Sequence, residues 1–138
     1  MDNQVRLTLI GRQWDPSGSE TVTELSADAD FYERNGSLYI LYEEKAEDGS
    51  PTKNVIKYKN NLLELTRKGA FNTCMVFAPG REYMTDYVTS FGLLKFGILT
   101  DSVKSQRQED YLEITADYTL KEQERVISYC KIDIKIQF

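Results

Sequence analysis

The sequence predicts an all-β protein, a closed antiparallel up-and-down barrel of about eight to ten strands. Two observations support this fold class. Apolar residues recur at every second position along most of the chain, and turn signals interrupt this alternation at short intervals. The 138 residues suffice for one hydrophobic core, so we expect a single domain over residues 1–138.

The alternation is clearest in the last two predicted strands. One face of the final segment consists of Val126, Ser128, Cys130, Ile132, Ile134, Ile136 and Phe138, and charged residues dominate the other face. The preceding segment repeats the pattern with Leu112, Ile114, Ala116, Tyr118 and Leu120. Each of these strands is therefore expected to bury one face and to expose the other to water.

Short turns separate the earlier strands. They are predicted at Asn35-Gly36, Asp48-Gly49-Ser50-Pro51, Asn60-Asn61, Lys68-Gly69, Pro79-Gly80 and Phe91-Gly92. Before, between and after these turns we expect strands at residues 5–13, 20–34, 39–44, 52–59, 62–67, 71–77, 83–89 and 93–100. The polar segments 102–110 and 120–126 are expected to be loops or strand ends, with room for one short helical turn.

Connections this short join neighbouring strands in antiparallel pairs. A flat sheet of this many strands would leave two long edges exposed, so we expect closure into a barrel, with a two-sheet sandwich as the alternative.

A two-residue turn at Asn60-Asn61 would fix which side chains point into the barrel. It places Lys59 opposite Leu62, Tyr58 opposite Leu63, Lys57 opposite Glu64, and Ile56 opposite Leu65. The apolar pairs then share the inner face, which sends Asn54 and Arg67 inward, and the same parity sends Glu44 inward on the strand before. Because an unpaired buried charge is costly, we expect Glu44 and Arg67 to be paired, hydrogen-bonded or near a hydrated barrel mouth.

The composition narrows the possible functions. The chain has no histidine, which removes the Ser-His-Asp and Cys-His mechanisms, and adjacent carboxylates such as Glu43-Glu44 point to opposite faces of a strand. We therefore rank an enzyme third among the functional hypotheses and predict no metal or other cofactor. The glycines occur singly at turns, without a phosphate-binding loop.

Charge and hydropathy exclude two classes of partner. The net charge of −5 without a basic run argues against nucleic acid, and no apolar segment is long enough to span a bilayer. The first residues do not resemble a secretory signal, so we expect a cytoplasmic protein with no membrane partner. Cys74 and Cys130 are interpreted as reduced packing residues, with a disulfide as the open alternative. The oligomeric state stays open.

Short motifs spread over the chain are typical of one family. They are Phe31-Tyr32, Leu38-Tyr39-Ile40-Leu41-Tyr42-Glu43-Glu44, Asn54-Val55-Ile56-Lys57, Leu65-Thr66-Arg67-Lys68-Gly69, Tyr87-Val88-Thr89-Ser90-Phe91-Gly92 and Leu99-Thr100. In them the chain resembles the YwiB-like family of uncharacterised bacterial proteins over nearly its whole length. The resemblance implies a calycin-type barrel, similar to lipocalins and fatty-acid-binding proteins, with unknown function. It also implies a set of positions of interest: Tyr42, Glu44, Arg67, Gly69, Tyr87, Thr89, Gly92 and Thr100.

Nine Tyr, six Phe and one Trp suggest either an aromatic-lined cavity or a filled aromatic core. Our leading hypothesis is a non-catalytic barrel that binds a small, partly apolar ligand. Arg67 would pair with an anionic group of this ligand, while Tyr42, Tyr87 and Phe77 would line the wall. The candidate ligand-binding residues are Arg67, Glu44, Tyr42, Tyr87, Thr89 and Phe77. The alternative is a structural or protein-interaction module with a filled barrel and no ligand.

Overall fold

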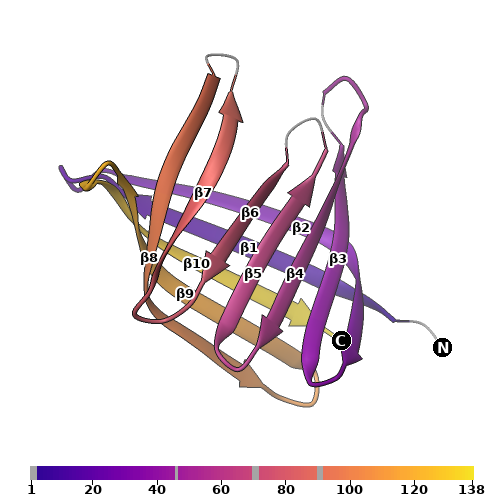
Figure 1. Ribbon diagram of the computed structural model, residues 1–138. Coiled ribbons are helices and arrows are strands. Elements are labelled where there is room, and N and C mark those ends of the chain that lie inside the picture. Colours follow the sequence, from indigo (N-terminus) through magenta and orange to yellow (C-terminus); the bar gives the residue numbers. More distant parts are fainter. Residues whose placement is uncertain (1–2, 46, 70–71, 90–91) are drawn as a thin grey trace.

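The structure is a computed structural model that describes residues 3–45, 47–69, 72–89 and 92–138, and these residues form ten antiparallel strands (Figure 1). The strands are β1 (Gln4–Trp14), β2 (Glu20–Arg34), β3 (Ser37–Lys45), β4 (Pro51–Lys59), β5 (Leu62–Lys68), β6 (Thr73–Phe77), β7 (Glu82–Thr89), β8 (Gly92–Arg107), β9 (Tyr111–Glu122) and β10 (Arg125–Gln137). None of the described residues forms a helix of the length and apolarity needed to cross a bilayer.

The strands form a nearly closed up-and-down barrel, which confirms the predicted fold class. Consecutive strands pair from β1 to β6 and from β7 to β10, and β1 also pairs with β10, so the spatial order runs from β6 through β1 and β10 to β7. Among the described residues, the ladder that is missing lies between β6 and β7. There the Thr85 hydroxyl donates a hydrogen bond to the carbonyl oxygen of Cys74 at 2.9 Å. The barrel is therefore open along one seam.

The turn at Asn60-Asn61 has the predicted geometry. Both asparagines have positive φ, 51° and 62°, as a two-residue hairpin turn requires. The register confirms the predicted pairs, including Ile56 opposite Leu65 and Asn54 opposite Arg67. Lys57 and Glu64 lie opposite each other on the outer face, where the Lys57 ammonium also lies 5.7 Å from the centre of the Tyr39 ring.

Of the segment 102–110, predicted to be a loop or a strand end, residues 102–107 are the end of a strand that is longer than the expected 93–100. β8 continues to Arg107, and a bulge between Thr100 and Ser102 shifts the alternation by one residue. Val103 is therefore buried, although simple alternation would place it outside. The residues that follow are polar, so the sequence shows no apolar alternation that would predict this part of the strand. The predicted strand start at residue 71 and the turn residue Phe91 lie outside the described residues.

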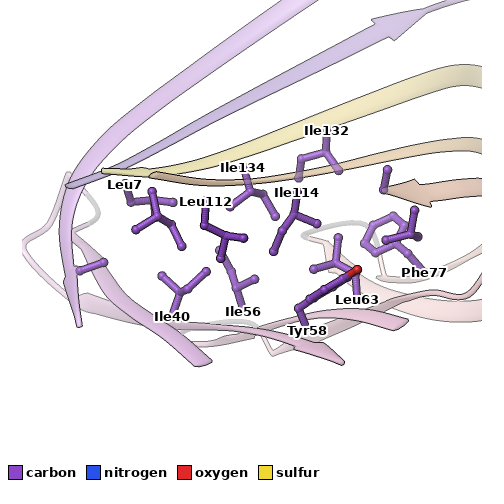
Figure 2. Packing of buried hydrophobic residues seen from close by; sticks show 14 of the residues in the cluster. Leu7, Ile40, Ile56, Tyr58, Leu63, Phe77, Leu112, Ile114, Ile132 and Ile134 are labelled. Atoms are coloured by element: carbon purple, nitrogen blue, oxygen red, sulfur yellow. The ribbon is translucent and has the colours of Figure 1, made fainter. Parts of the chain in front are cut away.

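The hydrophobic core fills the half of the barrel at which both chain termini lie (Figures 1 and 2). It contains fully buried side chains from most strands, among them Leu7, Ile40, Leu63, Ile114, Ile134 and Ile136. At the same end, Arg107 forms an ion pair with Glu33 at 2.7 Å and lies over the rings of Phe31 and Phe138. This end of the barrel is therefore packed.

The two cysteines are free thiols in different environments. Cys130 is buried, as expected for a packing residue, and burial raises the pKa of its thiol. Cys74 is exposed, so the packing interpretation is wrong for it. The reason is that Cys74 lies on the outer face of β6, since its neighbours Thr73 and Met75 point inward and line the cavity.

Candidate functional site

The half of the barrel opposite the chain termini contains a cavity of about 560 Å³. Its inner part is apolar and its outer part is polar. The apolar lining includes Leu9, Leu25, Ile56, Leu65, Met75 and Ile132, and the polar lining includes Gln13, Thr21, Asn54, Arg67 and Thr73. The barrel is therefore filled at one end and hollow at the other.

The strand register explains this division. Tyr42, Asn54, Arg67 and Thr73 lie opposite one another across β3, β4, β5 and β6. The next inward-facing row on the same strands is Ile40, Ile56, Leu65 and Met75. Successive inward positions are two residues apart, so a polar row at the mouth lies directly over an apolar row.

Asn54 and Arg67 of the polar row form a hydrogen-bonded cluster with Glu44, which lies two residues beyond Tyr42 on β3. Arg67 donates from Nη2 to Glu44 Oε1 at 3.3 Å and from Nε to Asn54 Oδ1 at 3.2 Å. Asn54 is only 6% exposed and donates from Nδ2 to the same Glu44 oxygen at 3.1 Å. The pairing of Glu44 with Arg67 expected from strand parity is confirmed, with Asn54 as the residue that joins them.

Tyr42 lies beside this cluster and stays protonated. Burial, together with the negative charge of Glu44, raises the pKa of Tyr42 to about 12, and the positive charge of Arg67 opposes the shift only in part. The side chain lines the cavity with its hydroxyl intact as a hydrogen-bond donor at physiological pH.

Aromatic residues of β7, β8 and β9 line the opposite wall. Tyr87 packs edge-to-face on Phe96 with 5.7 Å between the ring centres, and both rings line the cavity. Tyr118 also lines it, and burial raises the pKa of this phenol. Tyr87 thus takes the predicted place in the wall.

Two predicted site residues do not lie on the described wall. Phe77 is fully buried and packs edge-on against Tyr118 at 4.8 Å, so it supports a wall residue from behind instead of lining the cavity. Thr89 belongs to β7 and pairs with Gly92, but its side chain lies outside the described part of the chain.

Sequence reasoning missed the contribution of β1 and β2. Gly11 and Gln13 face Thr23 and Thr21 across the β1–β2 ladder, and all four line the cavity. The alternation Val5, Leu7, Leu9 continues into Gly11 and Gln13, which could have indicated an inner face that changes from apolar to polar.

The cavity suits binding better than metal chemistry. Among the described residues, no group of three or more Cys, Asp or Glu side chains is arranged to hold a metal ion. The Glu44 carboxylate already accepts hydrogen bonds from Asn54 and Arg67. The other polar groups of the lining are phenols, hydroxyls, amides, the Glu24 carboxylate, the Arg12 guanidinium and the remaining donors of Arg67.

Comparisons with known proteins agree with this architecture. A family model described as a domain of unknown function, DUF1934, matches residues 8–134. The chain is similar to the uncharacterized beta-barrel protein YwiB of Bacillus subtilis (strain 168), with 25% identity over 103 residues, which cover 75% of this chain and 72% of YwiB. It is also similar to the crystal structure of the ywiB protein from Bacillus subtilis, with a TM-score of 0.84, 21% identity, and coverage of 98% of this chain and 91% of that chain. At this identity the structural likeness shows the β-barrel fold alone.

Proposed function

The chain belongs to the DUF1934 family, and with that as the starting point we propose that it is a non-catalytic binding protein for a small amphipathic molecule. The observation that supports this function is the cavity of about 560 Å³ in a barrel whose other half is packed. Its size is typical of small-molecule sites, which measure about 300–1,000 Å³. A barrel with a purely structural role would gain stability by filling this space, since a void the size of a methyl group costs about 1 kcal/mol.

The division of the lining into an apolar and a polar part supports one orientation of the ligand. Its apolar part lies against Leu9, Leu25 and Leu65, and its polar part lies toward Asn54 and Arg67. Among the described residues, Arg67 contacts its neighbours through Nε and Nη2. The Nη1 donors are therefore available to an anionic or otherwise hydrogen-bond-accepting group of the ligand.

The charge and the thiols support a location and a class of partner. We place it in the cytoplasm, because an exposed free thiol such as Cys74 persists in a reducing compartment. The net charge of −5 supports a small-molecule partner over nucleic acid or an anionic membrane surface. The hollow up-and-down barrel likewise supports the calycin kinship that the sequence motifs suggest.

Native mass spectrometry of protein purified gently from its natural host tests this function. A retained small molecule is expected, and its mass gives the first indication of its identity. If no mass is retained, the amphipathic dye 1-anilinonaphthalene-8-sulfonate serves as the probe, with saturable fluorescence enhancement as the expected result.

A matched pair of variants assigns the binding to the cavity. Thr23→Trp places a large ring in the cavity and is expected to abolish binding, because Thr23 lines the wall. Val22→Trp adds the same ring one position away, where the side chain is 48% exposed on the outer face, and binding should be retained. Equal binding by both variants would contradict the proposal.

The alternative is a structural or interaction module, and the hydrogen bonds among Glu44, Asn54 and Arg67 favour it because they join three strands. In that case Arg67→Ala would lower the melting temperature while every ligand screen of the wild-type protein stays blank.

A further inference from the structure

A second concave surface lies outside the barrel, along the open seam between β6 and β7. It is a groove of about 380 Å³, lined by Thr66, Arg67, Lys68, Asn72, Thr73, Cys74, Met84, Thr85 and Asp86. Three of these residues, Thr66, Arg67 and Thr73, also line the cavity. The groove and the cavity therefore adjoin at Arg67, and the groove lies where the barrel wall is open between β6 and β7.

The strand arrangement accounts for this side opening. Among the described residues β6 and β7 share no ladder, and the Thr85 hydroxyl bridges them to the Cys74 carbonyl. Beyond that contact the β7–β8 hairpin leans away from β6 toward the open end of the barrel (Figure 1). Thr73 and Asp86, which are next to Cys74 and Thr85 in the chain, both line the groove.

We propose that this groove is a second subsite, and that the ligand is a bipartite amphiphile whose apolar chain lies in the cavity while its anionic headgroup lies sideways in the gap between β6 and β7. This inference rests on the proposed function. It adds the chemical class of the ligand and the route by which its head leaves the barrel.

The charges around the seam favour an anionic headgroup. Successive side chains of a strand point to opposite faces, so β5 presents Arg67 toward the interior and Lys68 toward the outside. Both cations line the groove, against one carboxylate, Asp86. Inside the cavity the balance is different, because Glu24 and Glu44 accompany Arg12 and Arg67. An anion therefore gains more in the seam groove than at the mouth.

The neutral groups of the groove are suited to a headgroup rich in oxygen. Asn72 accepts a hydrogen bond from the Gly69 amide through Oδ1, which leaves its NH₂ group to donate. Thr66 and Thr73 line both surfaces, and the Thr66 hydroxyl donates to Cys74 Sγ at 3.7 Å. The Asn72 amide, the Thr73 hydroxyl and Lys68 offer donors to a phosphate or a carboxylate.

Calorimetric titration with three probes tests the proposal: decan-1-ol below its solubility limit, decyl phosphate below its critical micelle concentration, and inorganic phosphate. The wild-type protein should bind decyl phosphate at least about tenfold more tightly than decan-1-ol, as one added charge-assisted contact predicts. Lys68→Gln should remove most of this preference. Lys53→Gln is the matched control, because Lys53 lies opposite Lys68 on β4 outside the groove lining, and it should keep the preference.

Alkylation of Cys74 by a maleimide locates the headgroup. Cys74 is exposed and lines the groove, whereas Cys130 is buried, so labelling reports on the seam. Decyl phosphate should slow the labelling and decan-1-ol should leave it unchanged.

The outcomes separate this inference from the function on which it rests. Equal affinity for the alcohol and the phosphate ester, with unprotected Cys74, overturns the seam subsite and leaves the cavity function standing. Binding of inorganic phosphate as tight as that of decyl phosphate overturns the bipartite ligand, because the apolar chain would then contribute nothing. Failure of both decyl compounds to bind overturns the inference together with the cavity function.

Discussion

Asn54 is the residue that turns two inward charges into a stable cluster. It is buried between Glu44 and Arg67 and uses its amide both to donate to the carboxylate and to accept from the guanidinium. A half-exposed ion pair alone contributes little, because water screens it. A buried amide that bonds to both members restricts their positions, so Arg67 keeps its location at the junction of cavity and seam.

The raised pKa of Tyr42, about 12, predicts a loss of stability in alkaline solution. Burial favours the neutral phenol in the folded state, so the folded protein holds its proton at a pH at which the unfolded chain, with a pKa near 10.0, has released it. The free energy of unfolding should therefore fall as the pH rises from about 10 toward about 12. Tyr42→Phe should reduce this slope, as measured by urea unfolding at about pH 9 and about pH 11.

Tyr32→Phe provides the control for this measurement, because Tyr32 is exposed. Its pH dependence should match that of the wild-type protein. An unchanged slope in Tyr42→Phe would show that this phenol ionises as freely in the folded state as in the unfolded one.

At the scale of single residues, sequence parity located Glu44, Asn54 and Arg67 because alternation tells inside from outside. It could not tell Phe77 from Tyr87, since both point inward. What separates them is depth along the barrel axis, which depends on strand tilt and register across the whole sheet.

Among the elements, the β7–β8 hairpin is the one with least support from neighbouring strands. β7 pairs with β8 along its whole length, but the ladder between β8 and β9 begins only at Gly97. No ladder joins β7 to β6 within the described residues. The part of the hairpin that carries Tyr87 and Phe96 is therefore a two-stranded ribbon, and a ribbon of this kind is only marginally stable alone.

Hydrogen exchange should reveal this difference. The amides of residues 93–96 are expected to exchange faster than those of residues 97–99, because smaller openings expose them, whereas residues 97–99 pair with both β7 and β9. Exchange followed by NMR gives the protection of each amide. Equal protection of the two stretches would contradict the prediction, and a slowing of exchange at 93–96 on addition of decyl phosphate would link the ribbon to the ligand.

The elements themselves were largely predictable. The hairpin at Asn60-Asn61 was readable because asparagine tolerates positive φ, so turn and register follow from the same two residues. The second half of β8 was not readable, because a bulge breaks the alternation at Thr100 and the residues after it are polar. A bulge is set by the pairing of two strands, and a single strand's sequence does not show it.

At the scale of the molecule, the two halves of the barrel differ in how their interior is packed. The half near the termini is packed and sealed by Arg107 over Phe31 and Phe138. The other half is hollow. The sequence predicted the barrel, but left open whether it is filled, since the same aromatic and aliphatic residues suit a core and a cavity wall.

Two leucines of β5 test this division. Leu63 is fully buried in the packed half, so Leu63→Ala should create a void and lower the free energy of unfolding by about 2–5 kcal/mol. Leu65 lines the cavity, so Leu65→Ala enlarges a space that already exists and should cost less than about 2 kcal/mol. Urea unfolding measures both. Equal losses would indicate that the cavity half is packed as tightly in solution as the other half.

The pairing of β1 with β10 also determines how the chain can fold. Every other ladder joins strands that are neighbours in sequence, whereas this one joins Arg6 to Gln137. Contacts between residues far apart in the chain slow folding, because the entropy of closing a long loop is lost before the contact forms. The hairpins can therefore form one by one during synthesis, but the barrel stays an open meander until its last strand reaches its first.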